Sequence, residues 1–259
     1  TYLAAMLVPF FIYRQRIGIP LEVALPMRAP RASLVVAGTF LTLALSSVGN
    51  IAADNLSALL RTVGLYAPQS RVALPTDAGG ITLYVLIYAV LSPVLEELVF
   101  RGVILQSLRR FGDGFALIIS AALFSLVHLD LLSLPYAFLA GLVIGYFVLR
   151  TGSLVTGLVI HLANNLFAVL YEALGRGLTP TQGALVSAIV FCFYLVLGLA
   201  AFVFAARRDA RIFTLIPSQT ALSEKAKLRL FSSSGTMLLF LVLTAIIISS
   251  GLSTSLHLW

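Results

Sequence analysis

Long uncharged apolar runs alternate with short polar connections along most of the chain. Crossing the hydrocarbon core of a bilayer takes about 20 apolar residues as a helix. We expect helices at 1–13, 32–53, 80–108, 114–133, 135–149, 153–173, 184–206 and 236–258. The first run is too short to span, so we expect it to be a truncated helix. The pattern predicts an all-α membrane bundle of about eight transmembrane helices.

The composition excludes an ordinary soluble domain. Of the 259 residues, 60% are hydrophobic and 10% are charged, whereas soluble domains are about 25% charged. The longest polar stretches, 54–79 and 207–231, are too short for a second domain, and the latter is suited to lie on the membrane surface. We expect a single transmembrane domain over residues 1–259.

The net charge of +7 follows topology and is not the footprint of a nucleic-acid-binding protein. Thirteen basic residues fall in alternate connections: Arg14, Arg16, Arg28, Arg31, Arg109, Arg110, Arg150, Arg207, Arg208, Arg211, Lys225, Lys227 and Arg229. Only Arg61, Arg71 and Arg176 fall in the other connections. Basic loops stay in the cytoplasm, so eight spans would leave both termini outside. Attraction to anionic lipid headgroups is an alternative reason for the excess.

Three ionisable residues, Glu96, Glu97 and Arg101, lie inside the apolar run at 80–108. A charge near the bilayer centre costs about 2.5–3.5 kcal/mol on insertion scales, so such residues are functional-site candidates. Residues four apart share a helix face, so Glu97 can pair with Arg101 while Glu96 points elsewhere. Pro93 can bend the helix just before the acids. The alternative is a hydrated helix end near the basic residues that follow the run.

Two further apolar runs carry groups of the same kind. His128 lies one helical turn after Phe124, and His161 lies one turn before Asn165. A lone histidine in an apolar helix is usually a core residue, but two histidines beside two acids favour a site. At 1.5 Å per residue, Glu96, His128 and His161 each lie on the order of 16–20 Å from the nearest cytoplasmic connection. Their similar depth predicts one shared site.

The three motifs, E-E-x-x-x-R, F-x-x-x-H and H-x-x-x-N, occur on separate helices between Glu96 and Asn165. In this order the chain resembles the CAAX protease and bacteriocin-processing family of intramembrane endopeptidases, the type II CAAX prenyl endopeptidase group. The resemblance implies hydrolysis of a peptide bond in a cavity within the bilayer, by a catalytic core at about 80–173.

The resemblance also implies a role for each motif residue. Glu96 would be the general base that activates water, assisted by His128. His161 and Asn165 would form the oxyanion hole, and the spacing favours Asn165 over the neighbouring Asn164. Glu97 and Arg101 would be a supporting pair, with Phe124 packing beside them. No cofactor is expected in this mechanism.

A zinc-dependent version of the same protease stays open, with Glu96, His128 and His161 as ligands and Glu97 as a possible base. Zinc commonly takes three such ligands and an open water position. A proton-coupled transporter would also bury acids and histidines, and a non-catalytic scaffold or immunity protein could keep the fold. The transporter predicts two related halves with broken helices, which the sequence does not display.

The expected partners are the lipid bilayer and a membrane protein or a lipidated or hydrophobic peptide as substrate. Arginine outnumbers lysine, which points to a bacterial cytoplasmic membrane and away from prenylated substrates. Gly141 and Gly145 provide a close-packing surface for helix contacts within the chain. The sequence leaves the substrate and the oligomeric state open.

Overall fold

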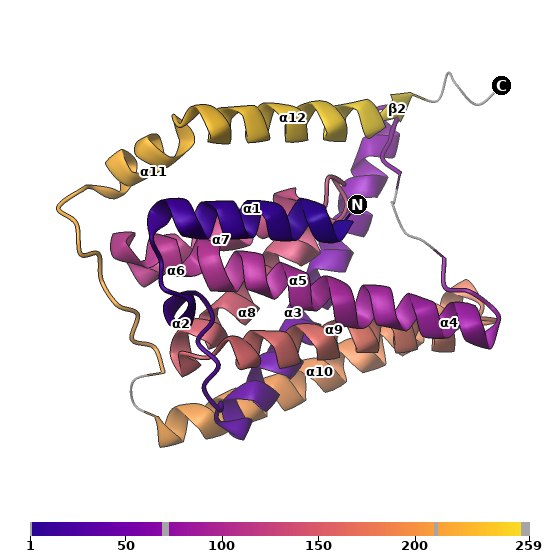
Figure 1. Cartoon of the computed structure of the whole chain (residues 1–259). Helices are drawn as coiled ribbons and strands as arrows, with labels where there is room; N and C mark the ends of the chain where they lie inside the picture. Colours follow the sequence, from indigo (N-terminus) through magenta and orange to yellow (C-terminus); the bar gives the residue numbers. More distant parts are fainter. Residues whose placement is uncertain (1, 69–72, 210–211, 255–259) are drawn as a thin grey trace.

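The computed structural model describes residues 2–68, 73–209 and 212–254 as a bundle of helices (Figure 1). Arg71 and Arg211, which entered the charge comparison, lie outside the described residues. The α-helices are α1 (Tyr2–Ile17), α2 (Leu21–Ala24), α3 (Ala32–Thr62), α4 (Ala78–Tyr84), α5 (Ser92–Glu97), α6 (Leu105–Leu108), α7 (Asp113–Leu126), α8 (Leu134–Thr151), α9 (Leu154–Gly175), α10 (Pro180–Arg208), α11 (Glu224–Ser232) and α12 (Gly235–Gly251). Two π-helical stretches, η1 (Val85–Leu91) and η2 (Leu98–Ile104), and a 3-10 turn, η3 (Arg109–Phe111), complete the helical elements.

The all-α membrane fold is confirmed, but a count of eight spans is not. Within the described residues, five helices are long and apolar enough to cross a membrane, or six if α11 and α12, bent by 75°, form one span. Helices form at all eight expected places, but α1 has 16 residues and α7 has 14. The run at 114–133 falls short of a span because α7 ends at Leu126 and the chain turns at Leu129, which has a positive φ of 56°.

The core forms where α3 packs against α8 and α10, and where α7 packs against α8. Its buried side chains are aliphatic or aromatic and come from α3, α6, α7, α8, α9 and α10, and from Ile212 after α10. Apolar burial alone gives little specificity inside a bilayer, so close packing of these faces fixes the helices. This packing brings α5 and α9 together, and these two helices carry the candidate acids and the second candidate histidine.

Helix α12 lies along one edge of the bundle (Figure 1). Thr244 is its single buried residue among those described, and its apolar side chains are otherwise largely exposed. Its C-terminal end is followed by β2 (Ser253–Thr254), which pairs antiparallel with β1 (Leu65–Tyr66) after α3. This two-residue strand pair leaves the fold class unchanged. The exposed apolar surface of α12 is suited to contact with lipid.

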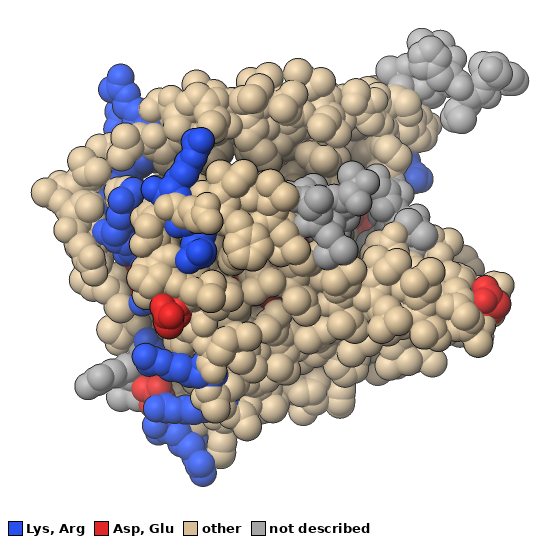
Figure 2. Space-filling view, viewed as in Figure 1, with Lys and Arg blue, Asp and Glu red and all other residues tan. Residues whose placement is uncertain are grey.

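The basic residues gather at one end of the molecule (Figure 2), where the α2 and α10–α11 connections lie. Several of them tie distant connections together at this end. Arg31 pairs with Asp209 at 3.0 Å, and Arg150 donates a hydrogen bond to the Thr214 carbonyl oxygen. The connections grouped by charge in the sequence therefore include segments that contact each other in space.

Candidate active site

The two acids lie in α5, one short α-helical stretch between two π-helical stretches of a continuous helix, Ala78–Phe111. A proline ring clashes with the carbonyl group four residues earlier in a regular α-helix. Just before Pro93 the helix widens, and the Ser92 N–H bonds to the Ile87 carbonyl oxygen, five residues back. The proline is thus accommodated by a wider turn. Single π-turns inside α-helices are frequent at functional sites.

Glu97 and Arg101 form the ion pair that their spacing predicts. An Oε1 atom of Glu97 lies 3.0 Å from Nη1 of Arg101, and both side chains are fully buried, at 0% and 1% exposure. Arg101 also donates to the Gly141 carbonyl oxygen of α8 at 3.3 Å. Its guanidinium lies 4.3 Å from the centre of the Phe124 ring, a cation–π contact. One arginine thus connects three helices.

His161 joins both acids from α9. Its Nδ1 donates to Oε1 of Glu97 at 2.9 Å, and its Nε2 lies 3.6 Å from Oε2 of Glu96. The close approach of α9 depends on Gly157, one turn before His161 on the same face. A Cβ atom at this glycine would lie 2.5 Å from Oε2 of Glu97. The absence of a side chain at Gly157 therefore allows α9, which carries His161, to contact Glu97 of α5.

Glu96 lies between a histidine and a serine. Besides its approach to His161, it accepts a hydrogen bond at 2.5 Å from Oγ of Ser92, one turn earlier on the same helix. The sequence analysis predicted neither of these two contacts. The i, i+4 spacing of Ser92 and Glu96 was a signal that could have revealed the serine. The contact with His161 joins residues 65 positions apart and had no local signal.

His128 sits on the other side of Phe124. Its Nδ1 donates to the Phe124 carbonyl oxygen at 2.8 Å, because a carbonyl oxygen only accepts hydrogen bonds. The Phe124 ring lies edge-on to both imidazoles, with centroid distances of 5.1 Å to His128 and 5.5 Å to His161. The histidine beside Glu96 is thus His161, and the expected assistance by His128 stays a prediction.

The Asn165 amide donates from Nδ2 to the Tyr88 carbonyl oxygen at 2.8 Å, which places it beside η1. Asn164, the neighbour that spacing disfavoured, donates to Oδ1 of Asn165 at 3.2 Å. The structure therefore brings Glu96, Glu97, Arg101, Phe124 and His161 into direct contact as one cluster. It places His128 and Asn165 at the borders of that cluster.

The charges of the cluster balance only with one further proton. Ionised Glu96 and Glu97 contribute two negative charges, and Arg101 contributes one positive charge. Burying an uncompensated charge is expensive, so buried charges are normally paired. The approach of His161 to both carboxylates places a third polar group beside this pair of acids.

The donor set of the zinc alternative is not gathered in this structure. Within the described part of the chain, no three His, Cys, Asp or Glu side chains are placed to hold one metal ion. Glu96 and His161 lie together, but within the described residues they form no such group with His128. The residues as arranged do not fit a three-ligand zinc centre.

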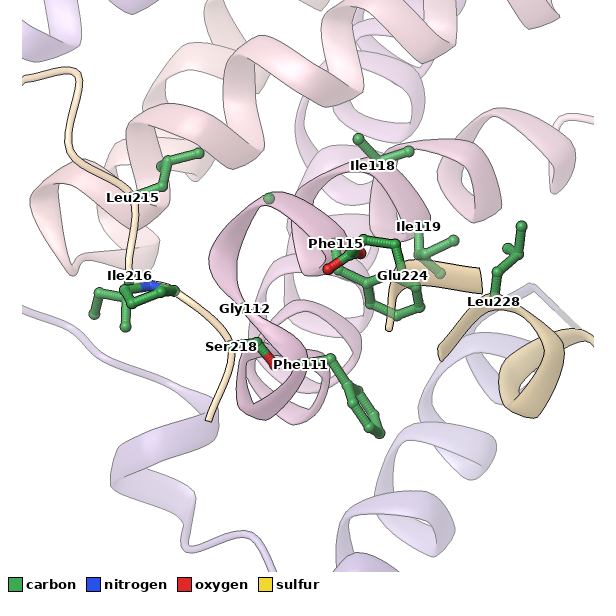
Figure 3. A pocket seen from close by; sticks show the side chains of 12 residues that line it. Phe111, Gly112, Phe115, Ile118, Ile119, Leu215, Ile216, Ser218, Glu224 and Leu228 are labelled. Carbon is green, nitrogen blue, oxygen red and sulfur yellow. The ribbon is translucent and has the colours of Figure 1, made fainter. Parts of the chain in front are cut away.

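A cavity of about 610 Å³ lies at the basic end of the bundle (Figure 3). Its lining is mostly apolar and comprises Phe111, Gly112, Gly114, Phe115, Ile118, Ile119, Leu215, Ile216, Pro217, Ser218, Glu224 and Leu228. A smaller hollow of about 210 Å³ lies between the loop Leu129–Leu131, just after His128, and the end of α12. The larger cavity contains none of the predicted site residues, so it is not the expected intramembrane active-site cavity.

Comparison with known proteins gives a match to one family and to curated relatives. The family described as "Type II CAAX prenyl endopeptidase Rce1-like" matches residues 78–167. A "Putative membrane peptidase YdiL" of Bacillus subtilis (strain 168) is 29% identical over 93 residues, 36% of this chain and 38% of that protein. A "Membrane-embedded CAAX protease MroQ" of Staphylococcus aureus (strain USA300) is 29% identical over 104 residues, 38% of this chain and 42% of that protein.

The chain thus spans about two fifths of the length of the curated relatives that it matches, and no solved structure gives a significant match. The matched range covers η1, α5, η2, α7, α8 and the part of α9 that carries His161 and Asn165. All three motifs fall inside it. The resemblance inferred from those motifs is confirmed: residues 78–167 match the type II CAAX prenyl endopeptidase Rce1-like family.

Proposed function

We propose that this protein is an intramembrane endopeptidase that hydrolyses a peptide bond of a membrane-associated protein or hydrophobic peptide. The observation that carries the proposal is the buried cluster in which His161 bridges Glu96 and the Glu97–Arg101 pair. This cluster is formed by two helices apolar enough to span a membrane, Ala78–Phe111 and α9, and lies inside the range matched by the protease family. The names of both relatives, a peptidase and a CAAX protease, support a peptide substrate.

In the proposed reaction, the Glu96 carboxylate takes a proton from a water molecule. The water oxygen forms a bond to the carbonyl carbon of the substrate, whose oxygen becomes negatively charged. The C–N bond then breaks, and the proton passes from Glu96 to the leaving amine. A correctly placed general base contributes about 10²–10⁴-fold to such a rate.

The other groups act on charge and orientation. Asn165 and His161 are the proposed donors to the oxyanion, and His128 is the proposed assistant of Glu96. Glu97 orients His161 through Nδ1, in the way a buried carboxylate orients the histidine of a catalytic triad. Arg101 holds Glu97 in place, so it acts through that acid and not on the substrate. These roles require no metal.

The test is cleavage of membrane-embedded reporter peptides by the purified protein in liposomes, with a Glu96 variant beside it. Cleavage that depends on Glu96 supports the protease. A scaffold would show none, and a proton-coupled transporter would instead move protons or solute across the liposome membrane. Cleavage of reporters without a lipid anchor would show that the substrate need not be prenylated.

The zinc alternative makes a different prediction about metal content. We expect active protein to contain less than stoichiometric zinc and to keep its activity after exhaustive chelation, because Glu96 and not a metal activates the water. Elemental analysis of the active preparation and activity before and after chelation are the measurements. A zinc-dependent enzyme would lose activity on removal of the metal and regain it when zinc is added back. That outcome would reassign Glu96, His128 and His161 as ligands.

We also propose that the basic end of the bundle faces the cytoplasm of a bacterial cell. Cysteines introduced at Arg110, Thr151 and Thr220 should be shielded from an impermeant thiol reagent in intact cells, whereas one at Gly177 should be labelled. The native Cys192 is exposed and must first be replaced by serine. Labelling in intact and permeabilised cells is compared. Labelling of the first three positions in intact cells would contradict this orientation.

A further inference from the structure

The Tyr88 carbonyl group lies in the π-helical stretch η1, where the hydrogen-bond pattern of the helix differs from that of a regular α-helix. In a regular α-helix it would accept a hydrogen bond from the N–H of Ser92, four residues on. Here the Ser92 N–H bonds to Ile87 instead, because the turn is π-helical. The next candidate in a π-helix is residue 93, a proline, which has no N–H. The Tyr88 carbonyl is therefore released from its usual helical donors.

The Asn165 side chain supplies a donor to this carbonyl. Its Nδ2 lies 2.8 Å from the Tyr88 oxygen. A carbonyl oxygen only accepts hydrogen bonds, so this contact determines which end of the Asn165 amide points toward η1. The amide NH2 faces Tyr88, and Oδ1 faces the opposite direction, toward Asn164.

The orientation of the Asn165 amide determines that of Asn164 on the same helix, and Asn164 in turn contacts α3. Since Oδ1 of Asn165 can only accept, Asn164 must donate to it from Nδ2, at 3.2 Å. Oδ1 of Asn164 is thereby turned toward α3, where it accepts from the hydroxyl of Ser46 at 3.2 Å. Ser46 is a buried polar residue, and its hydroxyl would be costly to bury without a partner. Each group in this chain has one consistent orientation.

We propose that Asn164 and Ser46 are positioning residues that hold the Asn165 amide with its N–H groups toward the reaction site, and that Pro93 contributes by freeing the Tyr88 carbonyl. This inference rests on the proposed function, in which Asn165 is a donor to the oxyanion. One N–H of Asn165 anchors the amide on Tyr88, and the second is free to meet the developing charge. Fixed donors stabilise a transition state more than mobile ones because they need no reorganisation.

The test compares Asn164→Leu, Asn165→Leu and the double variant in the cleavage assay. Loss of one oxyanion donor costs about 10²–10³-fold in kcat, so we expect this for Asn165→Leu. Asn164→Leu should lower kcat by about 10-fold with KM unchanged, since positioning is lost but the donor remains. The double variant should match Asn165→Leu alone, because Asn164 acts only through Asn165. Additive losses in kcat would overturn the proposal.

Ser46 provides a second variant if Asn164→Leu does not fold. Ser46→Ala should lower kcat with KM unchanged, and Ser46→Thr, which retains the hydroxyl, should restore it. The matched control is Ser47→Ala, because the Ser47 hydroxyl bonds to the Leu43 carbonyl oxygen of its own helix. Equal losses for Ser46→Ala and Ser47→Ala would overturn a specific role for Ser46.

A measurement without catalysis separates this inference from the proposed function. If the wild-type protein cleaves no reporter, the protease proposal fails, but the hydrogen-bond chain is still testable by unfolding in detergent. The Asn164 and Asn165 substitutions should then be non-additive in their shifts of the unfolding midpoint, because the two amides bond to each other. Additive shifts would show that the chain of hydrogen bonds does not form.

Discussion

Replacing Glu96 by glutamine should abolish peptide cleavage while the protein still inserts and folds. Glutamine has the same shape as glutamate and can still contact Ser92 and His161, but it cannot accept the proton of the attacking water. The loss should be at least the roughly 10²–10⁴-fold contribution of a general base. The measurement is the rate of reporter cleavage in liposomes, together with the thermal unfolding midpoint in detergent.

The matched control is Glu224→Gln at the other end of the molecule. Glu224 lines the cavity at the basic end, and its side chain is 75% exposed. Its substitution should leave the cleavage rate within about twofold of wild type, because Glu224 and its ion-pair partner Lys227 both lie outside the candidate site. Wild-type cleavage by purified Glu96→Gln protein would remove Glu96 from the mechanism. Equal losses in both variants would point to a general defect in reconstitution.

Arg101→Ala should lower both the stability and the activity of the protein. Removing one partner of a buried ion pair typically costs about 3–5 kcal/mol, because the other charge is left without compensation. Here the substitution leaves Glu97 beside His161 without its cation and also removes the contacts with Gly141 and Phe124. Activity should fall because Glu97 no longer holds His161 in one orientation. The unfolding midpoint and the cleavage rate are the two measurements.

The chain contains a second arginine–carboxylate pair with the same spacing, which serves as a control. Arg109 contacts Asp113 at 2.8 Å, but the Arg109 side chain is 31% exposed. The buried Asp113 carboxylate also accepts a hydrogen bond from the Ile216 N–H, so it keeps a partner in Arg109→Ala, which should shift the midpoint less than Arg101→Ala. Arg101→Lys should not restore the wild-type midpoint, because lysine cannot reproduce the planar fork of donors. An unchanged midpoint in Arg101→Ala protein would contradict the buried pair.

The helical segments were predictable because each apolar run satisfies its own backbone as a helix. Their number as spans was not, since this depends on where a helix ends. The run at 114–133 contains no Asp, Glu, Lys or Arg before Asp130, yet α7 ends at Leu126. Asp130 explains the difference in part: it is buried and bonds to the Leu132 N–H and the Ser133 hydroxyl, which stabilises a turn. These two hydrogen bonds join residues two and three positions apart, so they form a local turn in a stretch that is otherwise mostly apolar.

The pairing of Glu97 with Arg101 was predictable because both residues lie on one helix, where spacing determines proximity. The position of His161 against both acids was not, because it depends on how two helices pack. The π-turn before Pro93 was also missed, although the proline was recognised. The π-turn leads to the contact between Tyr88 and Asn165. These residues lie far apart in the sequence, so their spacing along the chain could not predict the contact.

Gly157 makes the site sensitive to substitution at a residue that carries no reactive group. The helix that carries His161 can approach Glu97 only because residue 157 has no side chain; a single methyl group there would also lie 2.8 Å from Val148. Neither α5 nor α8 has room to yield without moving its own buried contacts. During evolution, a change of glycine to alanine here would push Glu97 away from the helix that carries His161 while all three motifs stayed intact. A family member with complete motifs can therefore be inactive, and the residue at this position should be inspected before activity is assigned from motifs.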